Sequence, residues 1–350
     1  MTVERITLRP GHEISRVIRG GWQLAGGHGE INPAEAVEDM IAFANAGITT
    51  FDCADIYTGV EEMIGAFRVE YARRYGAEAL ARIKVHTKLV PDLARLATVD
   101  KAYIQSIVDT SLARLRTERL DLVQFHWWDY DVPRYLDVIG WLNELRLQGK
   151  IANVSGTNFD TAKTAEILSA GVPLTSMQVQ YSLLDARPER TLAKLAQDND
   201  IWLLCYGTVA GGFLGDRWLG LAEPQEPLEN RSLTKYKLII DDFGGWELFQ
   251  ALLETLRKIA DRHGSDIATV ASAAMLGKPG VAAVIVGARN RSHLARNVAV
   301  SELRLTAQDR AEIAVVQAQG HVPEGDTYTL ERDRHGRHGS IMKYNLNADS

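Results

Sequence analysis

The chain has 350 residues, a formal net charge of −6 and an apolar fraction of 46%. This composition excludes a wholly disordered chain, and the acidic balance argues against a general nucleic-acid or membrane-surface binder. No apolar run reaches the ~18–20 residues of a membrane helix, the start lacks the apolar stretch of a signal peptide, and two cysteines exclude a disulfide framework. We therefore expect a soluble, cytoplasmic protein.

The first predicted element is a small hairpin. Residues 4–14 alternate around Pro10-Gly11, and we expect this hairpin to plug one end of the fold. Eight short β-rich runs follow and alternate with helical patterns. The runs are residues 15–22, 49–54, 83–89, 120–127, 151–156, 176–181, 201–206 and 281–287. Several are almost continuously apolar, which is typical of parallel strands buried on both faces.

The residues between the runs carry helix start and stop signals. Asn32 precedes Pro33, which predicts an N-cap followed by a proline at the first helical position. Gly47, Gly149 and Gly171 each lie between a helical pattern and the next strand, where a left-handed residue ends a helix.

Eight strands with crossover helices predict a (β/α)8 (TIM) barrel. A doubly wound sheet is the alternative, but the chain has no G-x-G-x-x-G turn to support it. We expect one domain over residues 1–350, with a core at 15–300 and a C-terminal helix and tail at 301–350. Residues 207–243 are expected to form a long irregular connection after the seventh strand, and residues 320–350 a polar, locally basic tail.

Reactive side chains stand at the ends of three adjacent predicted strands. Asp52 ends the second, with Tyr57 five residues later, Lys88 ends the third, and His126 ends the fourth. Strand ends meet at one rim of a barrel, so these four groups converge. An ammonium beside a tyrosine lowers the phenol pKa, and an aspartate holds the lysine in place. A neutral histidine then orients a carbonyl oxygen, so the set suits protonation of an oxygen as hydride reaches its carbon.

These residues lie in segments that resemble one family. AGITTFDCADIYTGVEEMIG (46–65) resembles the aldo-keto reductase signature, in which an aspartate and a tyrosine five residues apart follow the second strand. The resemblance runs over about residues 15–300. It continues through VHTKLVP, LDLVQFHWW, GKIANVSGTNF, MQVQYSLLD, CYGTVAGGFL and IVGARNRSHLARN.

The resemblance implies a barrel oxidoreductase that interconverts an aldehyde or ketone, sugars included, and its alcohol with NAD(P)(H). It implies a catalytic tetrad of Asp52, Tyr57, Lys88 and His126, with Tyr57 as the proton donor. The positions that it assigns to the cofactor are Thr157, Asn158, Gln178, Tyr206, Gly207, Gly287, Ala288, Arg289, His293 and Asn297. Its candidates for the substrate pocket are Trp22, Trp127 and Trp128, for which ordinary packing is the other interpretation.

Some positions depart from the family pattern. Thr58 follows the tyrosine in place of a glycine, and Gly207 replaces a common serine. Gly287, Ala288 and His293 stand where strongly NADP-dependent members carry groups that grip the 2′-phosphate. Arg289 supplies a guanidinium for that phosphate. We therefore favour NADP(H), with NAD(H) as the alternative.

Two other functions stay open: a redox-sensing regulatory subunit that binds cofactor with negligible turnover, and an NAD-dependent sugar dehydrogenase. The loops 23–32, 127–133, 207–243 and 320–350, which would choose the substrate, carry no motif that names it.

The basic tail has two interpretations. It either stays solvated or folds over the barrel mouth, where Arg332, Arg334, Arg337 and Lys343 would favour phosphorylated or carboxylated substrates. His335 and His338 are spaced like ligands, but we expect no metal site.

Overall fold

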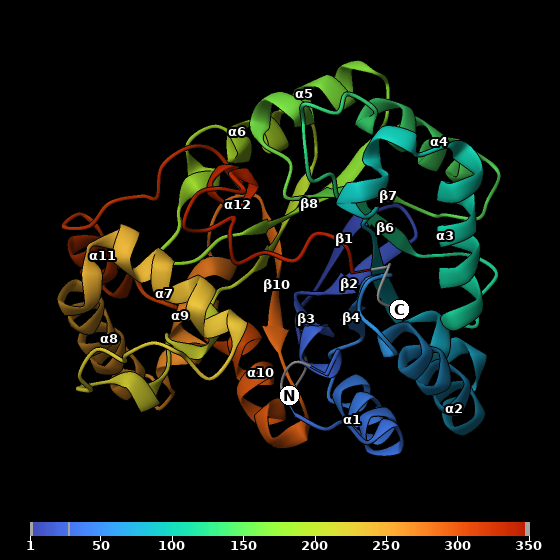
Figure 1. The fold of residues 1–350 in the computed structure, drawn as a ribbon. Coiled ribbons are helices and arrows are strands. Elements are labelled where there is room, and N and C mark those ends of the chain that lie inside the picture. Colours follow the sequence, from blue (N-terminus) through green and yellow to red (C-terminus); the bar gives the residue numbers. More distant parts are fainter. Residues whose placement is uncertain (1–2, 27–28, 347–350) are drawn as a thin grey trace.

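The structure is a computed structural model that describes residues 3–26 and 29–346. Residues 27–28 of the first predicted substrate loop and 347–350 of the tail lie outside the described residues. Eight parallel strands close into a barrel, which confirms the predicted fold class (Figure 1). In barrel order they are β10 (Val281–Gly287), β3 (Val17–Gly20), β4 (Thr50–Asp52), β5 (Lys84–Leu89), β6 (Leu122–Phe125), β7 (Val154–Thr157), β8 (Leu174–Gln180) and β9 (Trp202–Tyr206).

Helices surround the strands. They are α1 (Pro33–Asn45), α2 (Val60–Ala81), α3 (Lys101–Arg114), α4 (Tyr135–Leu147), α5 (Thr161–Ser169), α6 (Leu192–Asp198), α7 (Arg231–Phe243), α8 (Gly245–Arg262), α9 (Ile267–Leu276), α10 (Leu294–Glu302), α11 (Ala307–Gln317) and α12 (Thr329–Arg332). Within the described residues, none of these helices has both the length and the apolar character to cross a membrane.

The predicted helix start and stop signals are present in the structure. The Asn32 side chain accepts hydrogen bonds from two backbone N–H groups in the first turn of α1, as an N-cap residue does. Gly47, Gly149 and Gly171 have φ angles of 98°, 88° and 81°, a region that costs a residue with a Cβ atom free energy. These positions end α1, α4 and α5, so each following strand begins in the expected register.

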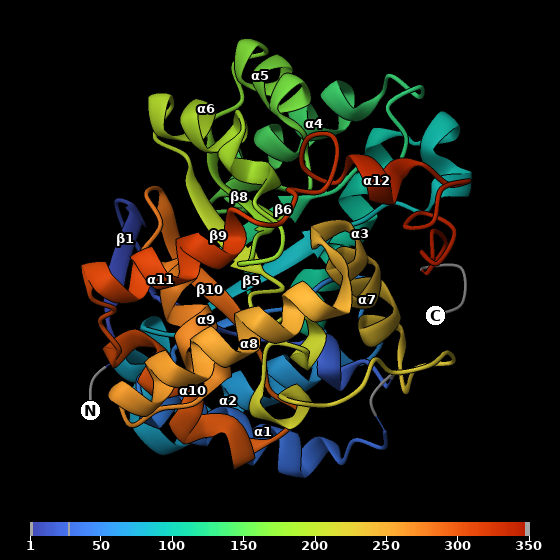
Figure 2. The ribbon, with the colours of Figure 1, turned by 90° about the vertical axis from the view of Figure 1, so that its left-hand side faces the viewer.

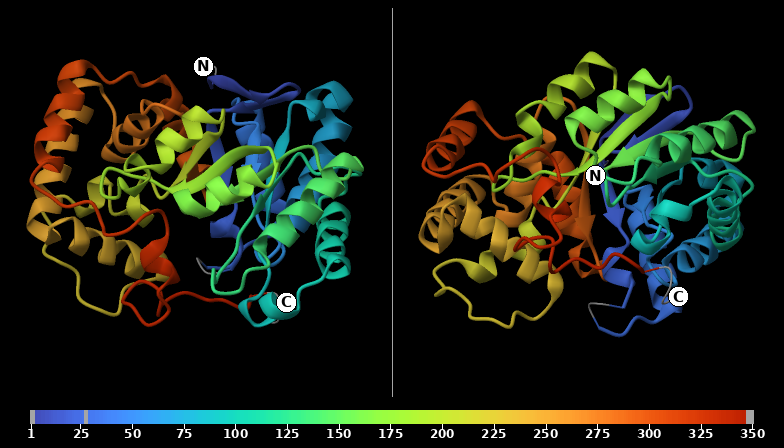
Figure 3. Two further views of the ribbon diagram at one scale, coloured as in Figure 1. Left: turned by 90° about the horizontal axis from the view of Figure 1, so that it is seen from above. Right: turned by 45° about the horizontal axis from the view of Figure 1, so that its top comes forward.

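The hairpin covers the N-terminal end of the barrel, as predicted. Strands β1 (Arg5–Arg9) and β2 (His12–Ser15) pair antiparallel. Leu8 and Ile14 are buried in a cluster with Ile18 of β3 and Leu204 of β9. Figure 3 shows the hairpin at one end of the barrel and the C-terminal tail near the other. The cavity described below therefore opens at one end only.

Two histidines meet beneath the barrel. His12 of β2 and His86 of β5 are buried and stacked, with their Nε2 atoms 3.0 Å apart. Burial, together with the neighbouring charges, lowers the pKa of His12 to about 2 and that of His86 to about 3. Both rings are therefore neutral in the folded protein above pH ~4.

The connection after β9 differs from the expectation. Residues 207–230 are largely irregular, but residues 231–243 form helix α7 and are followed by α8 and α9. The Asn230 side chain caps α7 by accepting a hydrogen bond from the Leu233 N–H. Apolar side chains of α7 recur at helical spacing and are buried: Leu233, Tyr236, Ile239, Ile240 and Phe243. The irregular prediction was therefore wrong for residues 231–243, because this short amphipathic pattern was overlooked.

The tail is not free in solvent. After α11 the chain crosses back over the C-terminal end of the barrel, where the short helix α12 lies (Figure 2). Arg332 donates hydrogen bonds to the carbonyl oxygens of Asn158 and Trp127. Arg334 pairs with Asp129 at 3.1 Å. The tail therefore folds over the barrel mouth, as the second interpretation of the basic tail expected.

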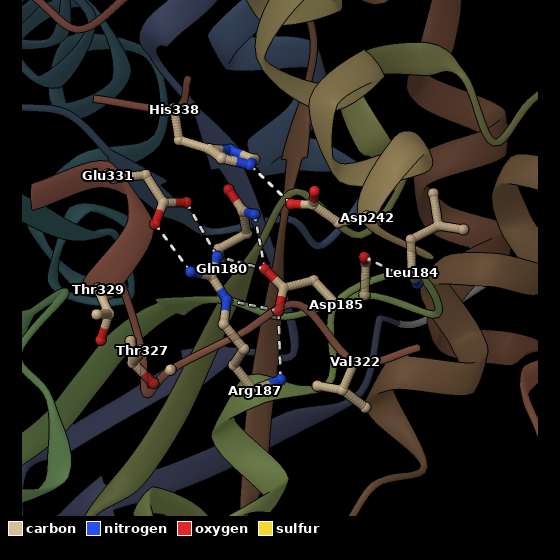
Figure 4. Close-up of polar contacts among 12 residues, drawn as sticks. Gln180, Leu184, Asp185, Arg187, Asp242, Val322, Thr327, Thr329, Glu331 and His338 are labelled. Atoms are coloured by element: carbon tan, nitrogen blue, oxygen red, sulfur yellow. Dashed lines mark hydrogen bonds and ion pairs between the residues drawn. The ribbon is translucent and has the colours of Figure 1, made fainter. Parts of the chain in front are cut away.

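Helix α7 holds a further part of the tail. Arg337 lies 3.1 Å from the carboxylate of Asp242. His338 lies 2.7 Å from the same carboxylate (Figure 4). His338 is thus an ion-pair or hydrogen-bond partner here, and among the described residues no cluster of three potential metal ligands occurs.

A buried ion-pair cluster anchors α12, and Figure 4 shows its geometry. Arg187 binds both carboxylate oxygens of Glu331 at 2.9 Å and both of Asp185, and all three side chains are at most 1% exposed. Burial alone would raise the pKa of Glu331, but the adjacent Arg187 guanidinium lowers it to about 2. We name this cluster (Asp185, Arg187, Glu331) the tail anchor.

We expect Glu331→Gln to release the tail. Removing one partner of a buried ion pair typically costs ~3–5 kcal/mol. The variant should become sensitive to limited proteolysis beyond residue 320 and should unfold at a lower temperature. Glu324→Gln is the control, because this carboxylate lies exposed on the same segment. Equal protease resistance in both variants would contradict a structural role for the tail anchor.

We also expect the folded state to lose stability as the pH falls below the ordinary histidine pKa of ~6.5. Because burial lowers the pKa of His86, the unfolded chain binds more protons in this range. The free energy of unfolding therefore falls by about 1.4 kcal/mol for each pH unit between pH ~6.5 and the pKa of His86 in the folded protein. His86→Gln should flatten the slope of unfolding free energy, measured by urea titration from pH 6.5 to 4, by about this amount. The exposed His321→Gln should leave the slope unchanged.

Candidate active site

A cavity of about 840 Å³ opens at the C-terminal ends of the barrel strands. All four side chains predicted to be catalytic line it: Asp52, Tyr57, Lys88 and His126. They come from the end of β4, the loop that precedes α2, strand β5 and the residue after β6. Parallel strand ends converge at this rim, which explains how residues 74 positions apart meet.

A buried ion pair lies at the bottom of this cavity. The Lys88 ammonium is 2.5 Å from the Asp52 carboxylate and donates a second hydrogen bond, of 2.9 Å, to the Cys53 carbonyl oxygen. Burial alone would lower the pKa of Lys88, but the Asp52 charge outweighs it and raises that pKa. Lys88 is therefore charged at neutral pH.

Two glutamines hold the aspartate in turn. Gln124 and Gln178 each donate a side-chain N–H to Asp52 Oδ2, at 2.9 and 2.7 Å. Gln178 also donates to the Gln124 oxygen at 2.8 Å. Because both Asp52 oxygens are bound, the carboxylate orientation and the Lys88 position are fixed before any ligand binds.

Tyr57 lies beside the lysine, with Lys88 Nζ 5.0 Å from the phenol ring centre. The Trp22 ring meets Tyr57 at 5.2 Å in an edge-to-face arrangement. Burial raises the pKa of Tyr57, and the Lys88 charge opposes this change without reversing it. Lys88 thus lowers the pKa of Tyr57, as we expected, but burial raises it by more. The net shift of the Tyr57 pKa is upward, opposite to our expectation.

His126 is neutral, as expected, since burial lowers its pKa to about 3, with Arg332 adding to the effect. Its Nδ1 atom lies 3.2 Å from the carbonyl oxygen of Thr157. A carbonyl oxygen only accepts, so Nδ1 carries the proton and the buried Nε2 presents a lone pair. Nε2 has no partner among the described residues. His126 can therefore accept a hydrogen bond from an alcohol hydroxyl, whereas we had expected it to donate to a carbonyl.

Most of the residues assigned to the cofactor line the same cavity: Thr157, Asn158, Gln178, Tyr206, Gly207, Gly287, Arg289, His293 and Asn297. Ala288 does not, because it is fully buried and its carbonyl oxygen accepts a 3.4 Å hydrogen bond from Arg19. Asn297 is 4% exposed, and its Nδ2 atom has no hydrogen-bond partner within the described part of the chain.

The amide groups near His126 suit a carboxamide ligand. The Tyr206 hydroxyl donates to Asn158 Oδ1 at 2.9 Å, which leaves the Asn158 side-chain N–H groups as donors. The two N–H groups of Gln178 are used within the barrel, so its oxygen is the free acceptor. A donor and an acceptor side by side match the two ends of a nicotinamide carboxamide, so the residues present fit the implied cofactor.

The three tryptophans predicted to line the substrate pocket differ in their environments. Trp22 and Trp128 line the cavity, but Trp127 does not. Trp127 is fully buried, and its indole N–H donates to the Val132 carbonyl oxygen at 3.0 Å. Alternation along the extended chain directs adjacent side chains to opposite sides, which places Trp127 in the packing layer. Its assignment to the substrate pocket was wrong.

Our sequence reasoning missed three residues near the catalytic groups. Lys235 and Tyr236 of α7 and Tyr328 of the tail line the cavity. Arg332, which we had named as a cation of the tail, packs against Tyr328 with its guanidinium 5.3 Å from the ring centre. A Cβ atom at Gly207 would lie 2.3 Å from the Tyr236 hydroxyl oxygen, so this glycine makes room for Tyr236. The amphipathic pattern of residues 231–243 was the signal that could have found the α7 residues.

Known proteins were compared with the chain. The model of the aldo/keto reductase family matches residues 16–318. The aldo-keto reductase YhdN of Bacillus subtilis is 26% identical over 312 residues, which cover 87% of this chain and 91% of that protein. The uncharacterized oxidoreductase Rv2298 of Mycobacterium tuberculosis is 30% identical over 305 residues, 85% of this chain and 88% of that protein.

The solved glycerol dehydrogenase AKR11B4 from Gluconobacter oxydans has a similar fold. The TM-score is 0.76 at 23% identity, with 93% of this chain and 98% of that chain covered. This likeness concerns the fold alone. Because the family match spans every strand of the barrel and all four residues predicted to be catalytic, the chain belongs to the aldo/keto reductase family of oxidoreductases.

Proposed function

We propose that this protein is an NAD(P)H-dependent enzyme that interconverts an aldehyde or ketone and its alcohol, with Tyr57 as proton donor. The observation that carries the proposal is the buried Lys88–Asp52 pair beside Tyr57 in a cavity of about 840 Å³. A cavity of this volume is large enough for a small substrate together with part of a cofactor.

The proton transfer follows from the neighbours of Tyr57. Because burial raises its pKa, the phenol is protonated at neutral pH and can donate to a developing alkoxide. The phenolate that remains is then stabilised by the Lys88 ammonium. Asp52, fixed by Gln124 and Gln178, keeps this ammonium in place without any rearrangement during the reaction.

His126 binds the other side of the reacting oxygen. In the alcohol form, the substrate hydroxyl donates to the free Nε2 atom. An alcohol has one hydroxyl proton, so in reduction this contact forms only after Tyr57 has delivered that proton. In oxidation the hydroxyl turns from Nε2 to the Tyr57 phenolate before its proton is taken. Both directions are open to this arrangement, so the cofactor and the supply of substrate set the working direction.

The cofactor positions follow from the amide pair described above. Asn158 and Gln178 would hold the carboxamide, Tyr206 the ring, and Asn297 with Arg289 the adenosine end. When bound there, the nicotinamide supplies or accepts the hydride. We favour NADP(H), because Arg289 is exposed and, among the described residues, makes only one hydrogen bond, to the Glu30 carbonyl oxygen.

Tyr57→Phe tests the proton donor. Loss of a general acid typically costs ~100- to 10,000-fold in rate, so we expect turnover of a simple aldehyde to fall by at least ~100-fold. Cofactor affinity, followed by quenching of tryptophan fluorescence, should stay within ~2-fold of the wild type.

Tyr103→Phe is the matched control, because Tyr103 lies on α3 outside the cavity. It should retain full activity. If Tyr57→Phe turned over at the rate of this control, the proton-donor assignment would be lost. If the wild type bound cofactor tightly and turned over no aldehyde, ketone or sugar, the regulatory-subunit function would replace the proposal.

Arg289→Met tests the cofactor preference. A charge-assisted hydrogen bond to a phosphate contributes ~1.5–3 kcal/mol, so NADPH affinity should fall by at least ~10-fold while NADH affinity changes by less than ~2-fold. Arg291→Met is the control, because its guanidinium is paired with Asp39 at 2.8 Å. Equal loss of both cofactors in Arg289→Met, or none, would contradict an NADP(H) preference set by this residue.

The cytoplasmic location and the organisation of residues 1–350 as one domain stay predictions. The same holds for the sugar dehydrogenase function, which the cofactor titration addresses, since it requires NAD(H) to bind more tightly.

A further inference from the structure

We propose that Lys235 binds an anionic group of the substrate, so that the natural substrate is a carbonyl compound carrying a carboxylate or a phosphate. This inference rests on the proposed function and names the substrate class for the same cavity. It makes Lys235 a specificity-determining residue that takes no part in the proton transfer.

Lys235 lies in the cavity wall inside a cage of aromatic rings. Its Nζ atom is 5.2 Å from the ring centre of Tyr206, 5.5 Å from that of Tyr236 and 5.7 Å from that of Tyr328. These rings come from β9, from α7 and from the tail, so three separate parts of the chain surround one ammonium. Tyr57 lines the same cavity as these three rings, so the cage and the proposed proton donor share one space.

The ammonium has no carboxylate partner of its own. Among the described residues, no ion pair or hydrogen bond involves Lys235 Nζ, although α7 carries a second lysine, Lys237, that pairs with Asp241 and Glu223. Burial lowers the pKa of Lys235, with a partial offset from Glu331 and Asp185. An ammonium held in this way gains from an anion that replaces its lost hydration.

The two carboxylates whose charges raise the pKa of Lys235 are already bound by an arginine. Glu331 and Asp185 each offer both oxygens to Arg187 in the tail anchor. Their charges moderate the field of Lys235 but supply no direct contact. Arg332 lies over the same Tyr328 ring as Lys235, 5.3 Å from its centre, and among the described residues it hydrogen-bonds only to backbone carbonyl oxygens. Lys235, Arg187 and Arg332 thus outnumber the two carboxylates, and the local excess of charge is positive.

The cage also offers neutral donors for an anion. The hydroxyl groups of Tyr236 and Tyr328 make no hydrogen bond in the described part of the chain, and both residues line the cavity with Lys235. A carboxylate or phosphate has several oxygens, so one binds the ammonium and others accept from the phenols. Lys343 of the tail lines the same cavity and adds a further positive charge near its mouth.

The test compares matched substrates with one another. For the full-length wild type, kcat/KM is measured for 4-carboxybenzaldehyde against benzaldehyde, and for glyceraldehyde 3-phosphate against glyceraldehyde. We expect the wild type to prefer the anionic member of at least one pair by at least ~10-fold, and the preferred pair tells carboxylate from phosphate. Lys235→Met should remove that preference while turnover of the neutral aldehyde changes by less than ~3-fold.

Two further variants separate charge from packing. Lys235→Arg keeps the charge and should retain most of the preference, and Lys237→Met removes a charge from the same helix and should retain all of it. If Lys235→Met does not fold, as judged by thermal unfolding, Lys235→Gln replaces it with a neutral polar side chain. A preference that survives the loss of the ammonium, or a wild type without any preference, overturns the inference and leaves the proposed function standing. A wild type that binds cofactor but turns over none of the four aldehydes, and no ketone or sugar, overturns both.

Discussion

The buried contact between Lys88 and Asp52 is the interaction on which the polar side chains at the C-terminal ends of the barrel strands depend. An ammonium and a carboxylate 2.5 Å apart, each almost completely removed from water, are stable only if every other polar atom around them is satisfied. Gln124 of β6 and Gln178 of β8 do this from across the barrel, and the Cys53 carbonyl oxygen accepts a further hydrogen bond from the lysine. The barrel interior is therefore polar at the level of the catalytic groups.

The barrel was predictable because its signals are local. β-Rich runs of six to eight residues marked all eight strands, and glycines with positive φ marked helix ends. Helix α7 and the course of the tail were harder to predict from the sequence. Residues 231–243 follow a long polar stretch that hid their helical period, and the tail is held by Arg187, which lies 144 residues before Glu331. Such pairings depend on the whole fold, which no short window of sequence reveals.

The same division holds within the site. The positions of Asp52, Tyr57, Lys88 and His126 followed from strand ends, whereas their protonation did not. Burial outweighs the lysine charge at Tyr57, and a backbone carbonyl of β7 decides which nitrogen of His126 bears its proton. Trp127 and Ala288, just beyond the ends of β6 and β10, do not line the cavity because adjacent side chains of extended backbone point to opposite sides. Proton positions and side-chain directions are properties of the packed environment.

The tail anchor also bears on how an unfinished chain behaves during synthesis. Arg187 and Asp185 emerge 144 and 146 residues before the glutamate that covers them. Until then the barrel mouth presents charged groups, which water solvates well, where an apolar closing contact would leave a sticky surface. Closing the fold with an ion pair therefore leaves the incomplete molecule less prone to associate than an apolar closing surface would. The cost is that water entering the closed fold weakens an ion pair more than it weakens an apolar contact.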